Sequence, residues 1–152
     1  IRSLGVKLKL SSTKTIVKNK SIILIDDSLV RGTTCHKIVK MLYESGAKEV
    51  HVRIACPEIK FPDFYGVDMP TKKELLAHEK NNREMCEYIK AKSLRFLSIE
   101  GLYKALINEK RNQNYPQFSD HYFTGEYPIR PADNLQGLKV KQLSLLSGKS
   151  NN

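Results

Sequence analysis

The sequence predicts an α/β domain built on a parallel sheet, and three stretches carry that prediction. Residues 21–26 (SIILID) are an apolar run, residues 33–45 have amphipathic helical spacing, and residues 50–56 (VHVRIAC) are a second apolar run. A strand, a helix and a strand in this order imply a right-handed crossover between parallel neighbours. Parallel strands are normally covered on both faces, so we expect the run 21–26 to be buried on both sides.

The chain before this unit is basic, because residues 1–20 contain no acidic side chain. Val6, Leu8 and Leu10 alternate with lysines and predict a strand with one wet face. Ile16 and Val17 predict a second short strand. The lysines of residues 1–20 fit either a solvated strand face or a role facing a phosphate, and the pattern leaves both open.

The helix predicted over residues 33–45 has apolar positions spaced i, i+3, i+4 and i+7, at Cys35, Ile38, Val39 and Leu42. Thr33 or Thr34 is a suitable N-cap residue. Gly46 is a natural residue to follow the helix end, because it tolerates the left-handed conformation.

The second half of the chain predicts further short elements in one domain covering residues 1–152. Residues 57–70 hold three prolines and three aromatic residues and predict a long ordered loop. Helices are expected over 71–79 and 82–91, the first with a capping box of Thr71 and Glu74. A strand over 94–97 and a helix over 99–107 follow, and periodicity fades after residue 108. We expect residues 131–152 to form a flexible tail.

Composition narrows the class of protein. The chain has 152 residues and a formal net charge of +10, which favours anionic partners such as phosphate metabolites. Specific nucleic-acid binding is disfavoured because no aromatic-basic module is visible. Three widely spaced cysteines and four scattered histidines lack zinc-site spacing. No apolar run reaches the length of a membrane span, and the cysteine usage fits a reducing cytoplasm.

The loop between the strand 21–26 and the following helix holds the candidate chemistry. A helix N-terminus presents unpaired backbone N–H groups to an anion, and Gly32, Thr33 and Thr34 stand there. Asp26 and Asp27 beside them suit a ligand with hydroxyl groups or a divalent cation. The plainer interpretation is that one acid caps a turn and the other is solvated. A phosphorylated sugar, with or without magnesium, is the predicted ligand.

The motif IILIDDSLVRGTT resembles the phosphoribosyl pyrophosphate signature of the type I phosphoribosyltransferases, which have a Rossmann-like parallel sheet. The stretches GVKLKLS, EVHVRIACPEIKFPDFYGVDMPTKKELLAH, FLSIEGL and YFTGEYP extend the resemblance over about residues 1–130. Together they resemble the C-terminal domain of the glutamine phosphoribosylpyrophosphate amidotransferases (amidophosphoribosyltransferases), which catalyse the first committed step of purine synthesis.

This resemblance implies roles for particular residues. Asp26 and Asp27 would bind the ribose hydroxyls and the magnesium of phosphoribosyl pyrophosphate. Residues 28–34, with Ser28, Arg31, Gly32, Thr33 and Thr34 among them, would hold the 5′-phosphate. For Arg31 the alternative is a solvent-facing side chain, which is the commoner state of a lone loop arginine. Lys9 would meet the pyrophosphate. Purine nucleotides are the implied second class of ligand.

The resemblance also implies absences. No stretch of this chain corresponds to the family's glutaminase domain, and the chain begins where the family has a flexible active-site loop. We therefore expect no glutaminase activity and weak or no transferase activity from this chain alone. The iron–sulphur cysteine positions of some members fall on Asp63, Ser119 and Tyr122, so no cluster is expected.

Two other hypotheses remain beside a transferase. The chain would be a non-catalytic module for ribose phosphates or nucleotides, or a subunit that pairs with an N-terminal fragment or another copy of itself through a free strand edge. The +10 charge also leaves nucleic-acid binding as a third, disfavoured hypothesis, which would show as strongly salt-dependent retention of RNA or DNA.

Overall fold

A computed structural model describes residues 14–65 and 71–129 of the chain. Within them, a parallel three-stranded sheet has the order β1-β2-β3, formed by Ser21–Asp26, Glu49–Ile54 and Ser93–Phe96. The helices are α2 (Lys14–Val17), α3 (Thr33–Glu44), the 3-10 helix η1 (Lys72–Glu74), α4 (Leu76–Glu79), α5 (Asn82–Ile89), α6 (Ile99–Ile107) and α7 (His121–Thr124). The predicted α/β class and parallel sheet are confirmed. The strand expected over residues 6–10 and the tail 131–152 lie outside the described residues.

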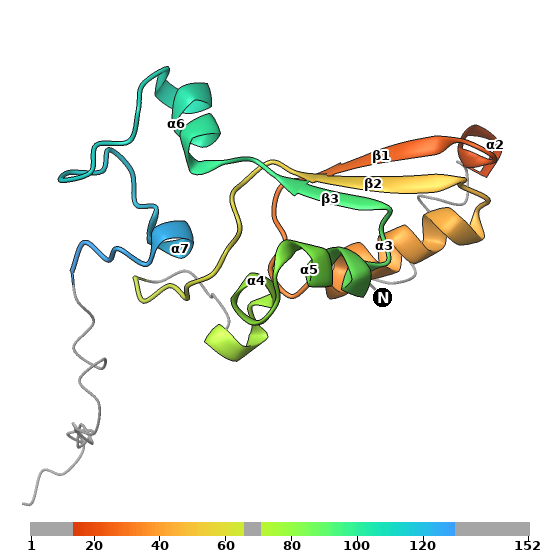
Figure 1. Ribbon diagram of the computed structural model, residues 1–152, viewed down its shortest axis with the longest axis horizontal. Coiled ribbons are helices and arrows are strands. Elements are labelled where there is room, and N and C mark those ends of the chain that lie inside the picture. The colour runs from red at the N-terminus through yellow and green to blue at the C-terminus, as the bar shows by residue number, and fades with distance from the viewer. Residues whose placement is uncertain (1–13, 66–70, 130–152) are drawn as a thin grey trace, which may run out of the picture.

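The core lies between one face of the sheet and the helices α3 and α5. Figure 1 shows α3, α4 and α5 on one side of the sheet, with α6 and α7 beyond the carboxyl ends of the strands. In the register, Leu24 lies beside Val52 and Val52 beside Leu94, so these side chains share a face. Val52 is fully buried and Leu94 nearly so. Burying an aliphatic side chain of this size contributes roughly 1.5–3 kcal/mol.

The opposite face of β1 is open within the described residues. Ile23 is 64% exposed and Ile25 is 73% exposed, so the prediction that this strand is buried on both faces is wrong there. β1 is an edge strand of the described sheet, and the described helices pack on the face that carries Leu24. The run of four hydrophobic residues therefore predicts that a strand forms, but it does not predict what covers the second face of that strand.

The short strand predicted at Ile16 and Val17 is also wrong, because these residues belong to the helix α2. The Lys18 N–H donates to the Lys14 carbonyl oxygen over 3.1 Å, which closes the turn, and Asn19 ends it with φ of 61°. Val17 is buried in the core while Ile16 is 68% exposed. One buried side chain in four suits a helical turn against the core better than an isolated strand with no ladder partner.

The helix predicted over residues 33–45 is confirmed as α3, but its cap differs. Gly32 occupies the N-cap position with φ of 73°, and no side chain caps the first turn, so neither threonine is the cap. Gly46 follows the helix with φ of 92°, as predicted. The helix expected over 71–79 is interrupted at Leu75, where ψ of 112° separates η1 from α4.

The later elements follow their predictions closely. The strand β3, the helix α6 and the helix α5 lie within one or two residues of the expected bounds. The helix α7 was not predicted, because four residues are too few for a periodic pattern. No helix among the described residues has the length and apolar character needed to cross a bilayer.

Candidate functional site

The predicted site residues gather around one hollow of about 320 Å³ at the carboxyl end of β1. Its lining is continuous in sequence from the last residue of β1 to the first turn of α3: Asp26, Asp27, Ser28, Leu29, Val30, Arg31, Gly32, Thr33, Thr34 and Cys35. The carboxyl ends of parallel strands are the usual place for ligands in such sheets. Seven of the eight predicted residues meet there, and Lys9 lies outside the described residues.

The two acids form the strand-side wall of this hollow, and each carboxylate accepts a hydrogen bond from the residue that follows it. The Asp27 N–H donates to Asp26 Oδ1 over 3.1 Å, and the Ser28 hydroxyl donates to Asp27 Oδ1 over 2.7 Å. Each carboxylate thus uses one oxygen to fix the turn and has a second oxygen available for a ligand. The plainer prediction was that one acid caps a turn and the other is solvated. Asp26 fits the capping part, because it accepts from a backbone N–H, whereas Asp27 accepts from a side-chain hydroxyl, and neither contact excludes a ligand.

The helix-side wall supplies backbone donors. The first helical bond of α3 runs from the His36 N–H to the Gly32 carbonyl oxygen over 2.8 Å. The N–H groups of Thr33, Thr34 and Cys35 precede that bond, and within the described residues no backbone acceptor reaches them. Both threonine side chains are exposed. Three donors and the positive end of a twelve-residue helix therefore face the hollow, which is a suitable place for a phosphate group.

Gly32 is fixed at the centre of the loop by its surroundings. Its φ of 73° lies in the left-handed region, and a Cβ there would stand 2.7 Å from Leu76 Cδ2 and 3.0 Å from Tyr88 Cε1. The loop therefore packs closely on α4 and α5 as well as adopting a conformation that disfavours other residues. The sequence suggested a glycine for close approach to phosphate, and the structure adds close approach to two side chains.

Arg31 points to a carboxylate of the protein rather than standing free. Its Nε donates to Glu74 Oε1 over 3.1 Å, and its Nη2 lies 3.1 Å from the same oxygen. Hydrogen bonding from Arg31 lowers the pKa of Glu74, which keeps that carboxyl ionised. Glu74 is thus a member of the site's surroundings that sequence reasoning identified only as a capping residue.

Two cysteines lie beneath the acids and are poor nucleophiles. Burial, together with the charge of Asp26, raises the pKa of Cys35 to about 11. Burial and the charge of Asp27 likewise raise the pKa of Cys56 to about 11. A thiol with such a pKa is protonated near neutral pH, so neither side chain offers a thiolate for catalysis.

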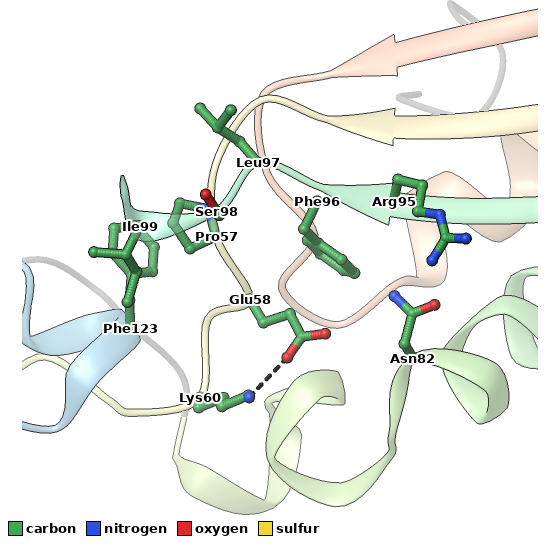
Figure 2. Close-up of a pocket in the computed structure, with 10 residues that line it drawn as sticks. All are labelled: Pro57, Glu58, Lys60, Asn82, Arg95, Phe96, Leu97, Ser98, Ile99 and Phe123. Carbon is green, nitrogen blue, oxygen red and sulfur yellow. Dashed lines mark ion pairs between the residues drawn. The ribbon is translucent and has the colours of Figure 1, made fainter. Parts of the chain in front are cut away.

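A second hollow, of about 350 Å³, opens beside the carboxyl ends of β2 and β3 (Figure 2). Its charged groups are Arg95 and the Lys60 ammonium, which pairs with the Glu58 carboxylate over 2.7 Å, and the rest of its lining mixes polar and apolar side chains. The start of α6 also lines it through Ser98 and Ile99. It contains no pair of neighbouring acids and none of the predicted residues, so the loop hollow remains the candidate site.

A buried polar network that the sequence did not predict joins the loop after β2 to α7. His121 Nε2 lies 2.7 Å from Asp63 Oδ1, both side chains are almost wholly buried, and the Ser119 hydroxyl lies 3.2 Å from His121 Nδ1. Burial, and after it the charge of Asp63 and a hydrogen bond with that carboxylate, raises the pKa of Tyr122. Asp63, Ser119 and Tyr122, the three positions singled out for a cluster, are therefore neighbours in space.

A second buried group lies beside this network. Arg111 donates to Asp120 through two nitrogens, over 2.5 and 3.2 Å, and the Tyr103 hydroxyl donates to Asp120 Oδ2 over 2.8 Å. No spacing in the sequence signals either group, because the partners are separated by irregular chain. Both fix the segment after α6 to the rest of the described structure.

Comparison with known proteins gives concordant results from sequence and structure. No family model matches the chain. The amidophosphoribosyltransferase of Rhizobium etli is 52% identical over 148 residues, covering 97% of this chain and 30% of the relative. The amidophosphoribosyltransferase of Staphylococcus aureus is 50% identical over 128 residues, covering 84% of this chain and 26% of the relative. The chain thus spans less than a third of the length of the curated relatives it matches.

Two solved structures resemble the chain. One is a glutamine phosphoribosylpyrophosphate amidotransferase from B. subtilis complexed with ADP and GMP, with a TM-score of 0.69 and 43% identity, covering 76% of this chain and 25% of that one. Another is described as the allosteric regulatory enzyme of purine biosynthesis, with a TM-score of 0.68 and 44% identity over 76% of this chain and 24% of that one. By sequence and by fold, the chain belongs to the amidophosphoribosyltransferase family.

Proposed function

We propose that the loop Asp26–Thr34 binds the ribose 5-phosphate part of phosphoribosyl pyrophosphate together with magnesium. In a polypeptide of the relatives' length, the site would serve the formation of 5-phosphoribosylamine from phosphoribosyl pyrophosphate and glutamine-derived ammonia. The observation that carries the proposal is the joining of two neighbouring carboxylates and an unpaired helix N-terminus in one hollow. A ligand that carries both hydroxyls and a phosphate matches that combination.

Each wall of the hollow has a distinct part. The free carboxylate oxygens of Asp26 and Asp27 accept hydrogen bonds from ribose hydroxyls. The N–H groups of Thr33, Thr34 and Cys35 donate to the 5′-phosphate, and the two threonine hydroxyls add further donors. Gly32 supports this arrangement of donors because it allows the loop to turn with φ of 73° and to pack closely against Leu76 and Tyr88.

The two acids also fit a shared magnesium ion. Magnesium usually keeps several waters and is held by one or two carboxylates plus substrate phosphates, which is what Asp26 and Asp27 can offer. Within the described residues, no cluster of three acid, histidine or cysteine side chains could hold a metal without such a ligand. When bound, the ion would neutralise charge on the pyrophosphate leaving group.

The protein's own contribution to the reaction is positioning. Ammonia displaces pyrophosphate from the anomeric carbon of the sugar while positive charge develops on the ring, so holding the phosphate and the hydroxyls sets the geometry of attack. Bound to the ribose hydroxyls, the carboxylates of Asp26 and Asp27 would supply negative charge near the developing positive charge on the ring. No protein nucleophile is needed, and the protonated thiols of Cys35 and Cys56 agree with this.

Purine nucleotides are proposed as a second class of ligand. The B. subtilis relative is described as complexed with ADP and GMP. Because a nucleoside monophosphate also carries a 5′-phosphate on a ribose with free hydroxyls, we expect it to compete for the same loop. A calorimetric competition experiment, in which GMP displaces bound phosphoribosyl pyrophosphate, tests this expectation.

Calorimetry tests the main proposal. We expect this chain to bind phosphoribosyl pyrophosphate with magnesium, and Asp26→Asn or Asp27→Asn to weaken binding about 10- to 100-fold, since a hydrogen bond to a charged group contributes roughly 1.5–3 kcal/mol. Glu109→Gln, at an exposed position two residues after α6 and outside the lining of the hollow, is the control and should leave the affinity unchanged. Equal affinities for wild type and both aspartate variants would refute the assignment.

A non-catalytic binding module is the second candidate, favoured by one observation: all the described ligand-facing groups come from a single stretch of ten residues. Such a stretch can bind a ribose phosphate without bringing a second substrate to it. Ammonia-dependent pyrophosphate release and glutamine hydrolysis by this chain separate the two. We expect binding with little or no turnover in either assay, and robust turnover would exclude the binding-only function.

We also propose that this chain carries no iron–sulphur cluster. Asp63, Ser119 and Tyr122 stand where cysteines would be needed, and they are engaged around His121 instead. Iron analysis and the visible absorption spectrum of anaerobically purified protein test this. Stoichiometric iron with sulphide would refute it.

A further inference from the structure

Segment Thr71–Leu76 fixes the loop that we assign to the ligand. Besides the Arg31–Glu74 pair, the Leu76 N–H donates to the Val30 carbonyl oxygen over 2.9 Å. Leu76 also lies against Gly32. Three consecutive loop residues are therefore each met by this one segment, although more than forty positions separate the two in sequence.

Glu74 links the segment to itself as well as to the loop. Its Oε2 accepts from the Thr71 N–H and from the Thr71 hydroxyl, each over 3.2 Å, while its Oε1 accepts from Arg31. One carboxylate thus ties the first turn of η1 to the loop. Arg31 has no other partner among the described residues, so its guanidinium position depends on Glu74.

We propose that Glu74 is a positioning residue for the ligand loop and acts through Arg31. The inference rests on the function proposed above and adds to it a residue outside the phosphate signature. The Arg31–Glu74 pair adds no net charge to its part of the rim, whereas Glu74 alone would place a further negative charge beside an anionic ligand. Removing Arg31 should therefore harm binding partly because it leaves Glu74 unpaired.

This arrangement makes a prediction that direct ligand contact by Arg31 does not. If Glu74 positions Arg31, Glu74→Gln weakens binding of phosphoribosyl pyrophosphate and magnesium by about two- to fivefold, the range expected when a half-exposed ion pair is lost. Arg31→Met weakens it more, and the double variant Arg31→Met with Glu74→Gln regains part of the loss. If Arg31 instead only contacts the ligand and Glu74 competes for it, Glu74→Gln tightens binding and the double variant regains nothing.

The chain offers matched controls for both changes. Glu84 is the corresponding capping residue of α5, where its Oε2 accepts from the Asn81 N–H over 2.8 Å. Among residues 14–65 and 71–129, no hydrogen bond or ion pair joins Glu84 to the loop. Arg83 pairs with Glu87 on an exposed helix face over 3.0 Å. Glu84→Gln and Arg83→Met therefore remove a capping carboxylate and an ion-paired arginine, respectively, without touching the site.

Two measurements on the full chain decide the matter. The first is calorimetric affinity for phosphoribosyl pyrophosphate with magnesium, where we expect losses for Glu74→Gln but not for Glu84→Gln, and partial recovery in the double variant. The second is hydrogen exchange of the loop amides without ligand, where Glu74→Gln should exchange faster than wild type over residues 29–34. Unchanged exchange with unchanged or tighter binding would overturn the positioning role. Absence of binding by wild type would refute the proposed function, while the exchange result would still test Glu74.

Discussion

Gly32→Ala is the substitution that most directly tests the geometry of the loop. The alanine would have to adopt φ of 73°, which costs a residue with a Cβ roughly 1–2 kcal/mol. Its Cβ would also stand 2.7 Å from Leu76 Cδ2 and 3.0 Å from Tyr88 Cε1, and forcing one extra carbon into a packed site costs about 1–3 kcal/mol. The two effects together predict a loss of roughly 2–5 kcal/mol in the free energy of unfolding.

Urea unfolding measured by circular dichroism provides the assay. Gly46→Ala is the matched control, because Gly46 also has a positive φ, of 92°, but its added Cβ would meet nothing closer than Lys18 Cγ at 3.4 Å. The control should therefore lose only the conformational part, roughly 1–2 kcal/mol. With a slope on the order of 2 kcal/mol per molar, Gly32→Ala should unfold at least about 0.5 M urea earlier than the control.

The test is the difference in stability loss between Gly32→Ala and Gly46→Ala. If Gly32→Ala loses no more stability than Gly46→Ala, Leu76 and Tyr88 yield without cost and the loop is not held by α4 and α5. That outcome would also weaken the positioning role assigned to the segment that contains Leu76.

Two further predictions concern titration. Burial raises the pKa of Asp120, but hydrogen bonds from Arg111 and Tyr103 outweigh it, so the net pKa lies below the ordinary value. The stabilisation is therefore present at neutral pH and is lost as pH falls through that lowered pKa. In urea titrations, Asp120→Asn should be less stable than wild type at about pH 7, and this difference in unfolding free energy should shrink between about pH 5 and pH 2. A difference that stays constant over this pH range would contradict the prediction. The second prediction concerns the rate at which Cys56 is alkylated in the folded chain at about pH 8, measured residue by residue with mass spectrometry, and we expect this rate to be slow. Asp27→Asn should raise the alkylation rate of Cys56, because it removes one cause of the raised pKa, while the rate of Cys86 should not change. Equal Cys56 rates in wild type and variant would place Asp27 away from the thiol.

Much of the fold follows from local patterns. The apolar run that gave β1 and the i, i+3, i+4, i+7 spacing that gave α3 are properties of consecutive residues, so their bounds agree closely with the structure. Patterns shorter than a turn or two were less informative. Ile16 and Val17 look alike in a helix or a strand, and only the burial of Val17 against the core decides for α2.

In the candidate site too, residues that are neighbours in sequence could be predicted, whereas contacts between distant segments could not. Asp26, Asp27, Gly32 and the threonines are contiguous, so a sequence motif could identify them, and the structure brings them around one hollow. Glu74 could not be recognised as a neighbour of Arg31 in the same way, because that contact spans 43 positions. Lys9 stays a prediction, since it lies outside the described residues.

The sequence by itself determined the strand–loop–helix unit, the acids and donors that this unit presents, and the family, because each depends on short-range pattern or on similarity along the chain. Only the tertiary structure decided which side chains surround that unit. It left Ile23 and Ile25 exposed on the second face of β1, paired Arg31 with Glu74, and buried Asp63 against His121. Such contacts depend on how distant segments pack, and no local spacing encodes them.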